Sequence, residues 1–121
     1  MSKRILVVED QEDNRRIVRD LLTSVGYEIV EAVTGEEGVS MAATHAPDLI
    51  LMDIQLPGLD GYEASRRIKA NAALRQIPII AVTSYALSGD DVKAFEAGCD
   101  AYVSKPFSPR ALLAKIREFV P

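Results

Sequence analysis

The chain has 121 residues, of which 48 % are hydrophobic, which is the size and composition of one domain with a core of its own. Its formal net charge is −4, which argues against a nucleic-acid-binding surface because binding phosphates requires an excess of basic side chains. Cys99 is the only cysteine, so a reducing, cytoplasmic location without disulfides is expected, and no apolar stretch reaches the roughly 18 residues of a membrane span.

The first two predicted elements are a strand and a helix. Residues 5–8 are all apolar and short, which is typical of a strand that is covered on both faces. Residues 12–24 have a helical pattern, and Gly26 is placed to end that helix. The apolar positions that recur at helical spacing are Ile17, Leu21 and Val25.

The next three predicted elements are a strand, a helix and a central strand. Residues 28–32 form the second extended segment. The sequence Thr34-Gly35-Glu36-Glu37 has the form of a capping box, so a helix should begin there and run to about Thr44 before Pro47. Residues 49–53 are the most apolar segment and should be the central strand.

The second half of the chain continues the alternation. A loop at residues 56–58 is followed by a helix start at Asp60-Gly61-Tyr62-Glu63, and residues 79–83 form the fourth strand. Ser88-Gly89-Asp90-Asp91 should begin the next helix, which Gly98 should end.

The last two predicted elements are a strand at residues 101–104 and a helix that begins at Ser108-Pro109, with proline at the first helical position. The apolar stripe of this helix is Leu112, Leu113, Ile116 and Phe119. Regular strand–helix alternation predicts an α/β protein, with a doubly wound parallel sheet and helices on both faces. The chain has no linker or repeat, so residues 1–121 should be a single domain without an output domain.

Polar residues stand at the ends of the predicted strands. Glu9 and Asp10 follow the first strand, Asp53 ends the third, Thr83 ends the fourth and Lys105 follows the fifth. In an open parallel sheet, ligands bind outside the carboxyl ends of the strands, so these side chains should converge at one edge. Three acids repel one another and imply a cation, and the lysine implies an anionic group.

Magnesium is the cation that this set of residues favours. It binds to one or two carboxylates together with waters and often a phosphate. Zinc is not expected, because the sequence has no cluster of histidine and cysteine. The sole histidine, His45, should be an exposed residue at a helix end. Cys99 should be buried and structural rather than redox-active.

Carboxylates, magnesium, a lysine and a hydroxyl together suit phosphoryl transfer, in which a carboxylate can be the nucleophile. Asp53 is the best candidate because it ends the central strand. Glu9 and Asp10 would hold the metal, and Thr83 and Lys105 would contact phosphoryl oxygens.

At this point the chain resembles a bacterial response-regulator receiver domain of the CheY-like superfamily over essentially its whole length. The matching motifs are Val8-Glu9-Asp10, Pro47-Asp48-Leu49-Ile50-Leu51-Met52-Asp53, Pro57-Gly58-Leu59-Asp60-Gly61, Val82-Thr83, Gly98-Cys99-Asp100-Ala101-Tyr102 and Lys105-Pro106. The resemblance implies a flavodoxin-like fold with five strands in the order 2-1-3-4-5 and five helices.

The resemblance also implies a role for each site residue. Asp53 matches the phosphorylated aspartate. Asp10 and Glu9 match the acid pair of the metal site, in which Asp10 would bind Mg²⁺ directly and Glu9 would usually bind it through water. Gln55 matches the position whose backbone carbonyl completes the metal site. Lys105 matches the phosphate-binding lysine.

A second group of matches concerns the response to phosphorylation. Thr83 matches the switch hydroxyl, and Tyr102 matches the aromatic residue whose rotamer reports phosphorylation. Pro106 matches a proline that receivers commonly hold in a cis peptide bond. The face that changes in the family corresponds here to residues 89–97, 101–104 and 108–119.

Within the family, Glu9-Asp10-Gln11 with Asn14 resembles single-domain cell-cycle regulators of the DivK type and receivers of hybrid kinases. Met1 and the absence of a linker favour a free-standing protein over a fragment of a hybrid kinase. The expected partners are a histidine kinase or histidine phosphotransfer protein and a downstream protein target, with the chain a monomer or weak dimer. No nucleic-acid or membrane partner is expected.

Two alternatives remain open. A degenerate receiver would act as an unphosphorylated binding module, and a phosphatase of the haloacid-dehalogenase type would also use an aspartyl phosphate. The phosphatase needs a second acid two residues after its nucleophile, where this chain has Gln55. The leading interpretation is a switch that modifies itself rather than an enzyme.

Overall fold

The five strands form one parallel sheet. The computed structural model describes residues 3–83, 90–105 and 107–120. The strands are β1 (Arg4–Val8), β2 (Glu28–Ala32), β3 (Leu49–Asp53), β4 (Ile79–Thr83) and β5 (Ala101–Ser104). Their order is β2-β1-β3-β4-β5, and every neighbouring pair is parallel. The predicted strand order is therefore confirmed, with β3 in the centre.

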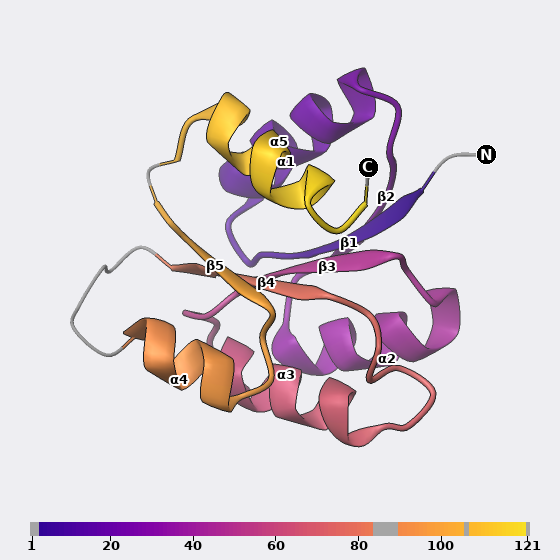
Figure 1. Cartoon of the computed structure of the whole chain (residues 1–121), viewed down its shortest axis with the longest axis vertical. Coiled ribbons are helices and arrows are strands. Elements are labelled where there is room, and N and C mark those ends of the chain that lie inside the picture. Colours follow the sequence, from indigo (N-terminus) through magenta and orange to yellow (C-terminus); the bar gives the residue numbers. More distant parts are fainter. Residues whose placement is uncertain (1–2, 84–89, 106, 121) are drawn as a thin grey trace.

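Helices cover both faces of the sheet (Figure 1). Helices α1 and α5 lie on one face and α2, α3 and α4 lie on the other. The helices are α1 (Glu12–Ser24), α2 (Gly35–His45), α3 (Gly61–Ala70), α4 (Asp90–Glu96) and α5 (Pro109–Arg117). None of the helices in the described ranges is long and apolar enough to cross a membrane.

Side-chain caps begin three of the helices where the sequence predicts them. The Thr34 hydroxyl, the Asp60 carboxylate and the Ser108 hydroxyl each accept a hydrogen bond from the backbone N–H three residues later. Such caps satisfy backbone groups that a helix end leaves without partners. The predicted start of α4 at Ser88-Gly89 lies outside the described residues.

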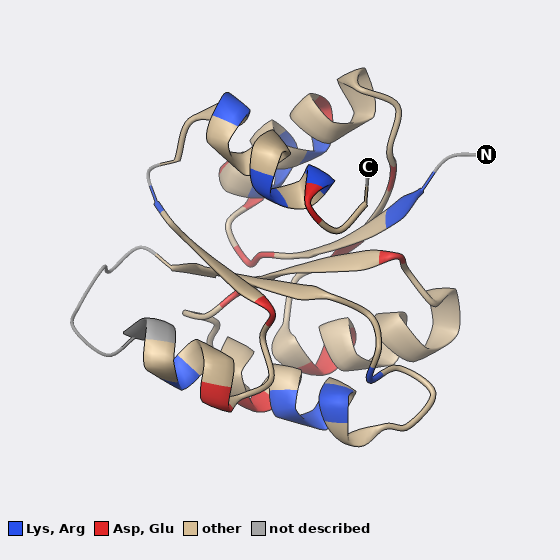
Figure 2. Cartoon of the chain, viewed as in Figure 1, with Lys and Arg blue, Asp and Glu red and all other residues tan. Residues whose placement is uncertain are grey.

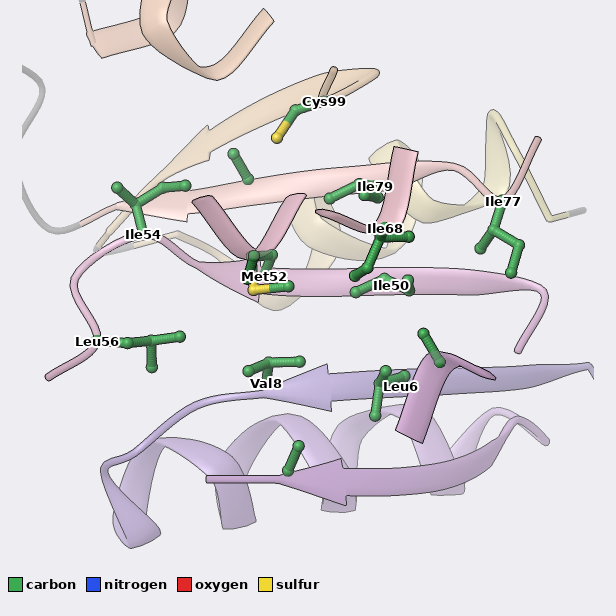
Figure 3. Packing of buried hydrophobic residues seen from close by; sticks show 14 of the residues in the cluster. Leu6, Val8, Ile50, Met52, Ile54, Leu56, Ile68, Ile77, Ile79 and Cys99 are labelled. Atoms are coloured by element: carbon green, nitrogen blue, oxygen red, sulfur yellow. The ribbon is translucent and has the colours of Figure 1, made fainter. Parts of the chain in front are cut away.

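Two hydrophobic clusters fill the spaces above and below the sheet. The cluster on the α2–α4 side includes Leu6, Val8, Ile50 and Met52, whose side chains point away from the strands toward Ile68 and its neighbours (Figure 3). The cluster on the α1–α5 side is built on the alternate positions of the same strands, among them Ile5, Val7, Leu49 and Leu51. Successive residues of a strand point to opposite faces, so each strand contributes to both clusters.

The buried face of α1 differs from the prediction. The side chains that α1 buries are Val18 and Leu22, whereas Ile17 is 60 % exposed and Val25 is 40 % exposed. Leu21 is half-buried against the α1–α5 side cluster. Both sets of residues have the i, i+4 spacing of one helical face, so spacing alone does not tell which set faces the sheet.

The apolar stripe predicted for α5 is confirmed in part, and the predicted burial of Cys99 is confirmed. Leu112 and Ile116 are fully buried, but α5 ends at Arg117, so Phe119 lies beyond the helix and packs against the same cluster. Cys99 is buried as expected, and its thiol donates a hydrogen bond to the Ser65 hydroxyl at 3.4 Å.

Candidate functional site

Three carboxylates meet at the carboxyl edge of the sheet. Glu9 and Asp10 directly follow β1, and Asp53 is the last residue of the neighbouring strand β3. Carboxylate oxygens of the three residues lie within 4.8 Å of one another. In Figure 2 the acidic segments that end β1 and β3 lie at the same edge of the sheet. The predicted convergence of these acids is therefore present.

Lys105 is the cation of this group. Its Nζ lies 2.7 Å from Glu9 Oε1 and 3.7 Å from Asp53 Oδ2, so its closer partner is the glutamate. The backbone N–H of Lys105 donates to the Thr83 carbonyl oxygen at the end of β4, the strand next to β5. This bond fixes the start of the loop that carries the lysine.

Burial of Glu9 and Asp53 makes it unfavourable for both side chains to be ionised when no cation is bound. Glu9 and Asp53 are each 5 % exposed. Burial raises the pKa of Glu9, and its hydrogen bond with Asp53 raises it further, while the hydrogen bond from Lys105 lowers it in part. A buried carboxylate beside a second carboxylate favours the protonated form. A bound cation would remove this cost.

Backbone groups hold the Asp53 carboxylate in place. The Gln55 N–H donates to Asp53 Oδ1 at 3.0 Å, and the Ile54 N–H donates to the Val82 carbonyl at 2.9 Å. A Cβ on Gly61 would meet the Asp53 carbonyl and would lie 2.7 Å from Ile54 Cα. Only a residue without a side chain lets α3 begin this close to the end of β3.

Thr83 and Tyr102 lie on neighbouring strands. Thr83 is 1 % exposed at the end of β4, and Tyr102 of β5 is half-buried against the cluster on the α2–α4 side. Thr83 therefore stands at the carboxyl edge of the sheet with the acids, whereas Tyr102 pairs with Ala81, two residues before the end of β5. The expected cis bond before Pro106 lies outside the described residues, as that proline does.

The donor set fits magnesium. All three clustered ligands are carboxylates, which are hard oxygen donors, and their oxygens are close enough to bind one ion. Gln55 directly adjoins the site through its backbone, although its side chain is exposed. The residues therefore match the expected Mg²⁺ site in chemistry and spacing.

Arg15 is a residue of the site that the sequence analysis did not identify. Its guanidinium donates to the Glu9 backbone carbonyl at 3.0 Å and to the Glu31 carboxylate of β2 at 3.0 Å. Arg19, one helical turn later, binds the same carboxylate. The signal was the i, i+4 spacing of Arg15 and Arg19 on α1 together with the second glutamate of β2, Glu31, which stands between Val30 and Ala32.

A pocket of about 290 Å³ adjoins the carboxylates. We call it the α1–α5 pocket, because Asn14, Ile17 and Val18 of α1 and Leu112 of α5 line it together with Phe107. Asp53, Glu9 and Lys105 line the same pocket. The site is therefore an open cavity with charged groups on part of its wall and apolar groups on the rest.

Sequence comparisons place these features among known proteins. Residues 5–117 match the family model described as the response regulator receiver domain. The chain is 42 % identical over 120 residues to the polar-differentiation response regulator DivK of Brucella ovis, covering 99 % of this chain and 98 % of that protein. The DivK of Brucella anthropi is similar to the same degree, with the same coverage.

Solved structures agree with the sequence comparisons. The receiver domain of sensor histidine kinase PA1611 from Pseudomonas aeruginosa, which has a magnesium ion coordinated in its active-site cleft, superposes with a TM-score of 0.92 at 38 % identity and covers 99 % of this chain and 98 % of that one. A putative response regulator from Chloroflexus aurantiacus has a TM-score of 0.95 at 28 % identity, with the same coverage. The chain belongs to the response regulator receiver domain family and is a DivK-like receiver of two-component signalling.

Proposed function

We propose that this chain is a phosphoacceptor switch in which Asp53 takes a phosphoryl group from a histidine of a partner kinase or phosphotransfer protein. The observation that carries this proposal is the buried Asp53 carboxylate, which lies beside two further acids and 3.7 Å from the Lys105 ammonium. A carboxylate placed in this way can act as a nucleophile toward phosphorus, provided that the charge around it is neutralised.

The proposed transfer forms one bond, breaks one bond and uses groups that lie in the site. An oxygen of Asp53 attacks phosphorus, the bond between phosphorus and the donor nitrogen breaks, and the donor imidazole keeps the electron pair. Lys105 can donate a hydrogen bond to one phosphoryl oxygen, and the Thr83 hydroxyl can donate to another. When bound by Glu9, Asp10, Asp53 and the Gln55 carbonyl, Mg²⁺ supplies the neutralising charge.

The donor histidine does not come from residues 1–121. His45 is the only histidine of the chain, and its carbonyl accepts a hydrogen bond from Arg4, at the beginning of β1. Asp53 lies at the other edge of the sheet, where the strands end. Four residue steps along a strand separate these edges by about 13 Å. The sole histidine therefore lies too far from Asp53 to donate to it directly.

Output would leave through the face made by α4, β5 and α5. Phosphoryl oxygens would draw the Thr83 hydroxyl inward, and the Tyr102 ring of the next strand would follow it. Partners would then recognise the altered face. A ligand shifts such an equilibrium by its differential affinity for the two states, so both positions of Tyr102 should exist before phosphorylation. The proposed setting is the cytoplasm, with the chain acting as a monomer or weak dimer.

Phosphorylation by a small donor tests the proposal. Wild-type protein incubated with acetyl phosphate and Mg²⁺ should gain the mass of one phosphoryl group, and Asp53→Asn should gain none. Asp60→Asn, which changes an exposed cap of α3, should be labelled as the wild type is. A wild-type protein that takes no label would instead support a degenerate receiver, and equal labelling of Asp53→Asn would refute the assignment of the acceptor.

The switch is tested separately from the acceptor. Thr83→Ala should still take the phosphoryl group, but slowly, and phosphorylation should no longer change affinity for the partner kinase or target. The measurement is partner affinity before and after labelling, by calorimetry or surface plasmon resonance. Full coupling in the variant would show that Thr83 does not transmit the signal.

A further inference from the structure

The α1–α5 pocket is more apolar than a phosphate site requires. Val18 and Leu112 line it from the two helices, Leu51 lines it from β3, and Ile17 and Phe107 are partly exposed beside them. Phosphoryl transfer to Asp53 involves charged groups, and none of these five side chains can contact phosphoryl oxygens favourably. The apolar part of the pocket wall is therefore suited to contact the apolar atoms of a phosphoryl donor rather than its phosphoryl group.

The charged and apolar parts share one cavity. Asp53 follows Leu51 by two residues in β3, so the two side chains point to the same face of the sheet, which is the face covered by α1 and α5. Lys105 and Glu9 line the same pocket. A molecule whose phosphoryl group lies beside Asp53 can therefore place its remaining atoms between α1 and α5.

We propose that this pocket receives the leaving group of the phosphoryl donor, and that the chain prefers acyl phosphates with an apolar chain of about four carbons over acetyl phosphate. This inference rests on the proposed function, because it assumes that Asp53 is the acceptor. A four-carbon acyl group, at roughly one water volume of about 30 Å³ per carbon, fills about 120 Å³. That is well within the 290 Å³ of the pocket.

The reaction needs no further reagent. An Asp53 oxygen forms a bond to phosphorus, and the bond between phosphorus and the acyl oxygen breaks. The carboxylate of the acyl group leaves with the electron pair, and it needs no proton because carboxylates are ionised at neutral pH. The apolar chain of the leaving group remains among the pocket side chains during the transfer.

A series of homologous donors tests the inference. Acetyl, propionyl and butyryl phosphate release carboxylates of nearly equal basicity, so differences in labelling rate report binding of the chain rather than reactivity of the phosphoryl group. Burial of one methylene changes an equilibrium about fourfold. Because the pocket is partly open, about a fivefold increase in the second-order rate constant is expected from acetyl to butyryl phosphate. The measurement is the rate of mass gain in Mg²⁺.

Two variants locate the effect. Ile17→Ser removes an apolar side chain from the pocket wall and should keep the fold, because Ile17 is 60 % exposed. It should lower the butyryl-to-acetyl ratio by about half. Val25→Ser is the matched control, because Val25 is also apolar and exposed but stands at the other end of α1. It should leave both rates unchanged.

The outcomes separate this inference from the proposed function. Equal labelling by all three donors would overturn the leaving-group pocket and leave Asp53 as the acceptor. A butyryl-to-acetyl ratio that is as high in Ile17→Ser as in the wild type would also overturn it, because the preference would then arise elsewhere. Absence of labelling by every donor would overturn the acceptor itself. The assignment is supported if the butyryl-to-acetyl ratio of labelling rates is above one in the wild type, is lowered in Ile17→Ser and is unchanged in Val25→Ser.

Discussion

Two lysines at opposite edges of the sheet have similar exposure but different surroundings. Lys69 is 17 % exposed and donates to the carbonyls of Arg75 and Ile77 and to Asp100, at 2.8 to 3.0 Å. Lys105 is 19 % exposed and lies beside the carboxylates of Glu9 and Asp53. The first lysine has one acid and two neutral acceptors, whereas the second lies in a group with three acids.

The difference separates a structural ion pair from a functional site. Asp100 also accepts the backbone N–H of Ile79, so the Lys69 group joins α3, β4 and the start of β5 with its charges balanced. The Lys105 group has a surplus of negative charge, which costs stability and prepares the site for a cation. Sites that bind ions commonly carry this kind of cost.

The largest expected effect on stability comes from replacing Lys69 or Lys105 with methionine, which has no charge. Lys69→Met should lower the free energy of unfolding by about 2 kcal/mol, because Asp100 and two carbonyls lose their donor. Lys105→Met should also lower the free energy of unfolding, but millimolar Mg²⁺ should restore the lost stability. Urea unfolding with and without Mg²⁺ measures both. If Mg²⁺ restores Lys69→Met as well, the proposed contrast between the two edges is wrong.

The next effect concerns the acids. Asp10→Asn should lower Mg²⁺ affinity by about tenfold or more, because a direct ligand is lost, and it should stabilise the metal-free protein by relieving repulsion. The matched control is Asp13→Asn on the exposed surface of α1, which should change neither. Melting temperatures over a Mg²⁺ titration report affinity, since a ligand of the folded state raises stability by mass action. A wild-type melting temperature that ignores Mg²⁺ would contradict the metal site.

A smaller effect is expected at Cys99, which belongs to the structural part of the molecule. Burial raises the pKa of its thiol, so the native protein should react slowly with thiol reagents at neutral pH and quickly in urea. Cys99→Ala should cost about 1 kcal/mol of stability and leave the rate of Asp53 labelling unchanged. Rapid modification of the native protein with loss of labelling would assign this thiol a redox role.

The smallest effect is the pH dependence of Glu9. Its pKa in the folded state is raised above the ordinary value of 4.5, so the folded protein retains a proton that the unfolded chain has released. This contribution to stability is present below about pH 4.5 and is lost as pH rises through the raised pKa. Glu9→Gln does not titrate, so its stability relative to the metal-free wild type should increase with pH across that window. A difference that stays constant or decreases would contradict the sign.

The sequence alone determined the elements and the residues that end them. Strand length, capping residues and helix-ending glycines are local properties, and they predicted the alternation, the start of α2 at Thr34 and the acids after β1 and β3. Parallel strands then bring those acids to one edge, so the sequence also predicts where the candidate site lies. The strand order came from resemblance to receiver domains, because nothing local specifies which strands are neighbours.

Contacts between distant segments were decided by the tertiary structure. The sequence predicted Ile17 on the apolar face of α1, but packing against the sheet buries Val18, and the exposed Ile17 lines the α1–α5 pocket instead. Arg15 reaches the carbonyl of Glu9, and Lys105 lies closer to Glu9 than to Asp53. These partners lie 6 to 96 positions apart, and their pairing depends on how helices and loops pack on the sheet. Residue spacing carries no information about such packing, because helices with the same spacing can dock through different faces.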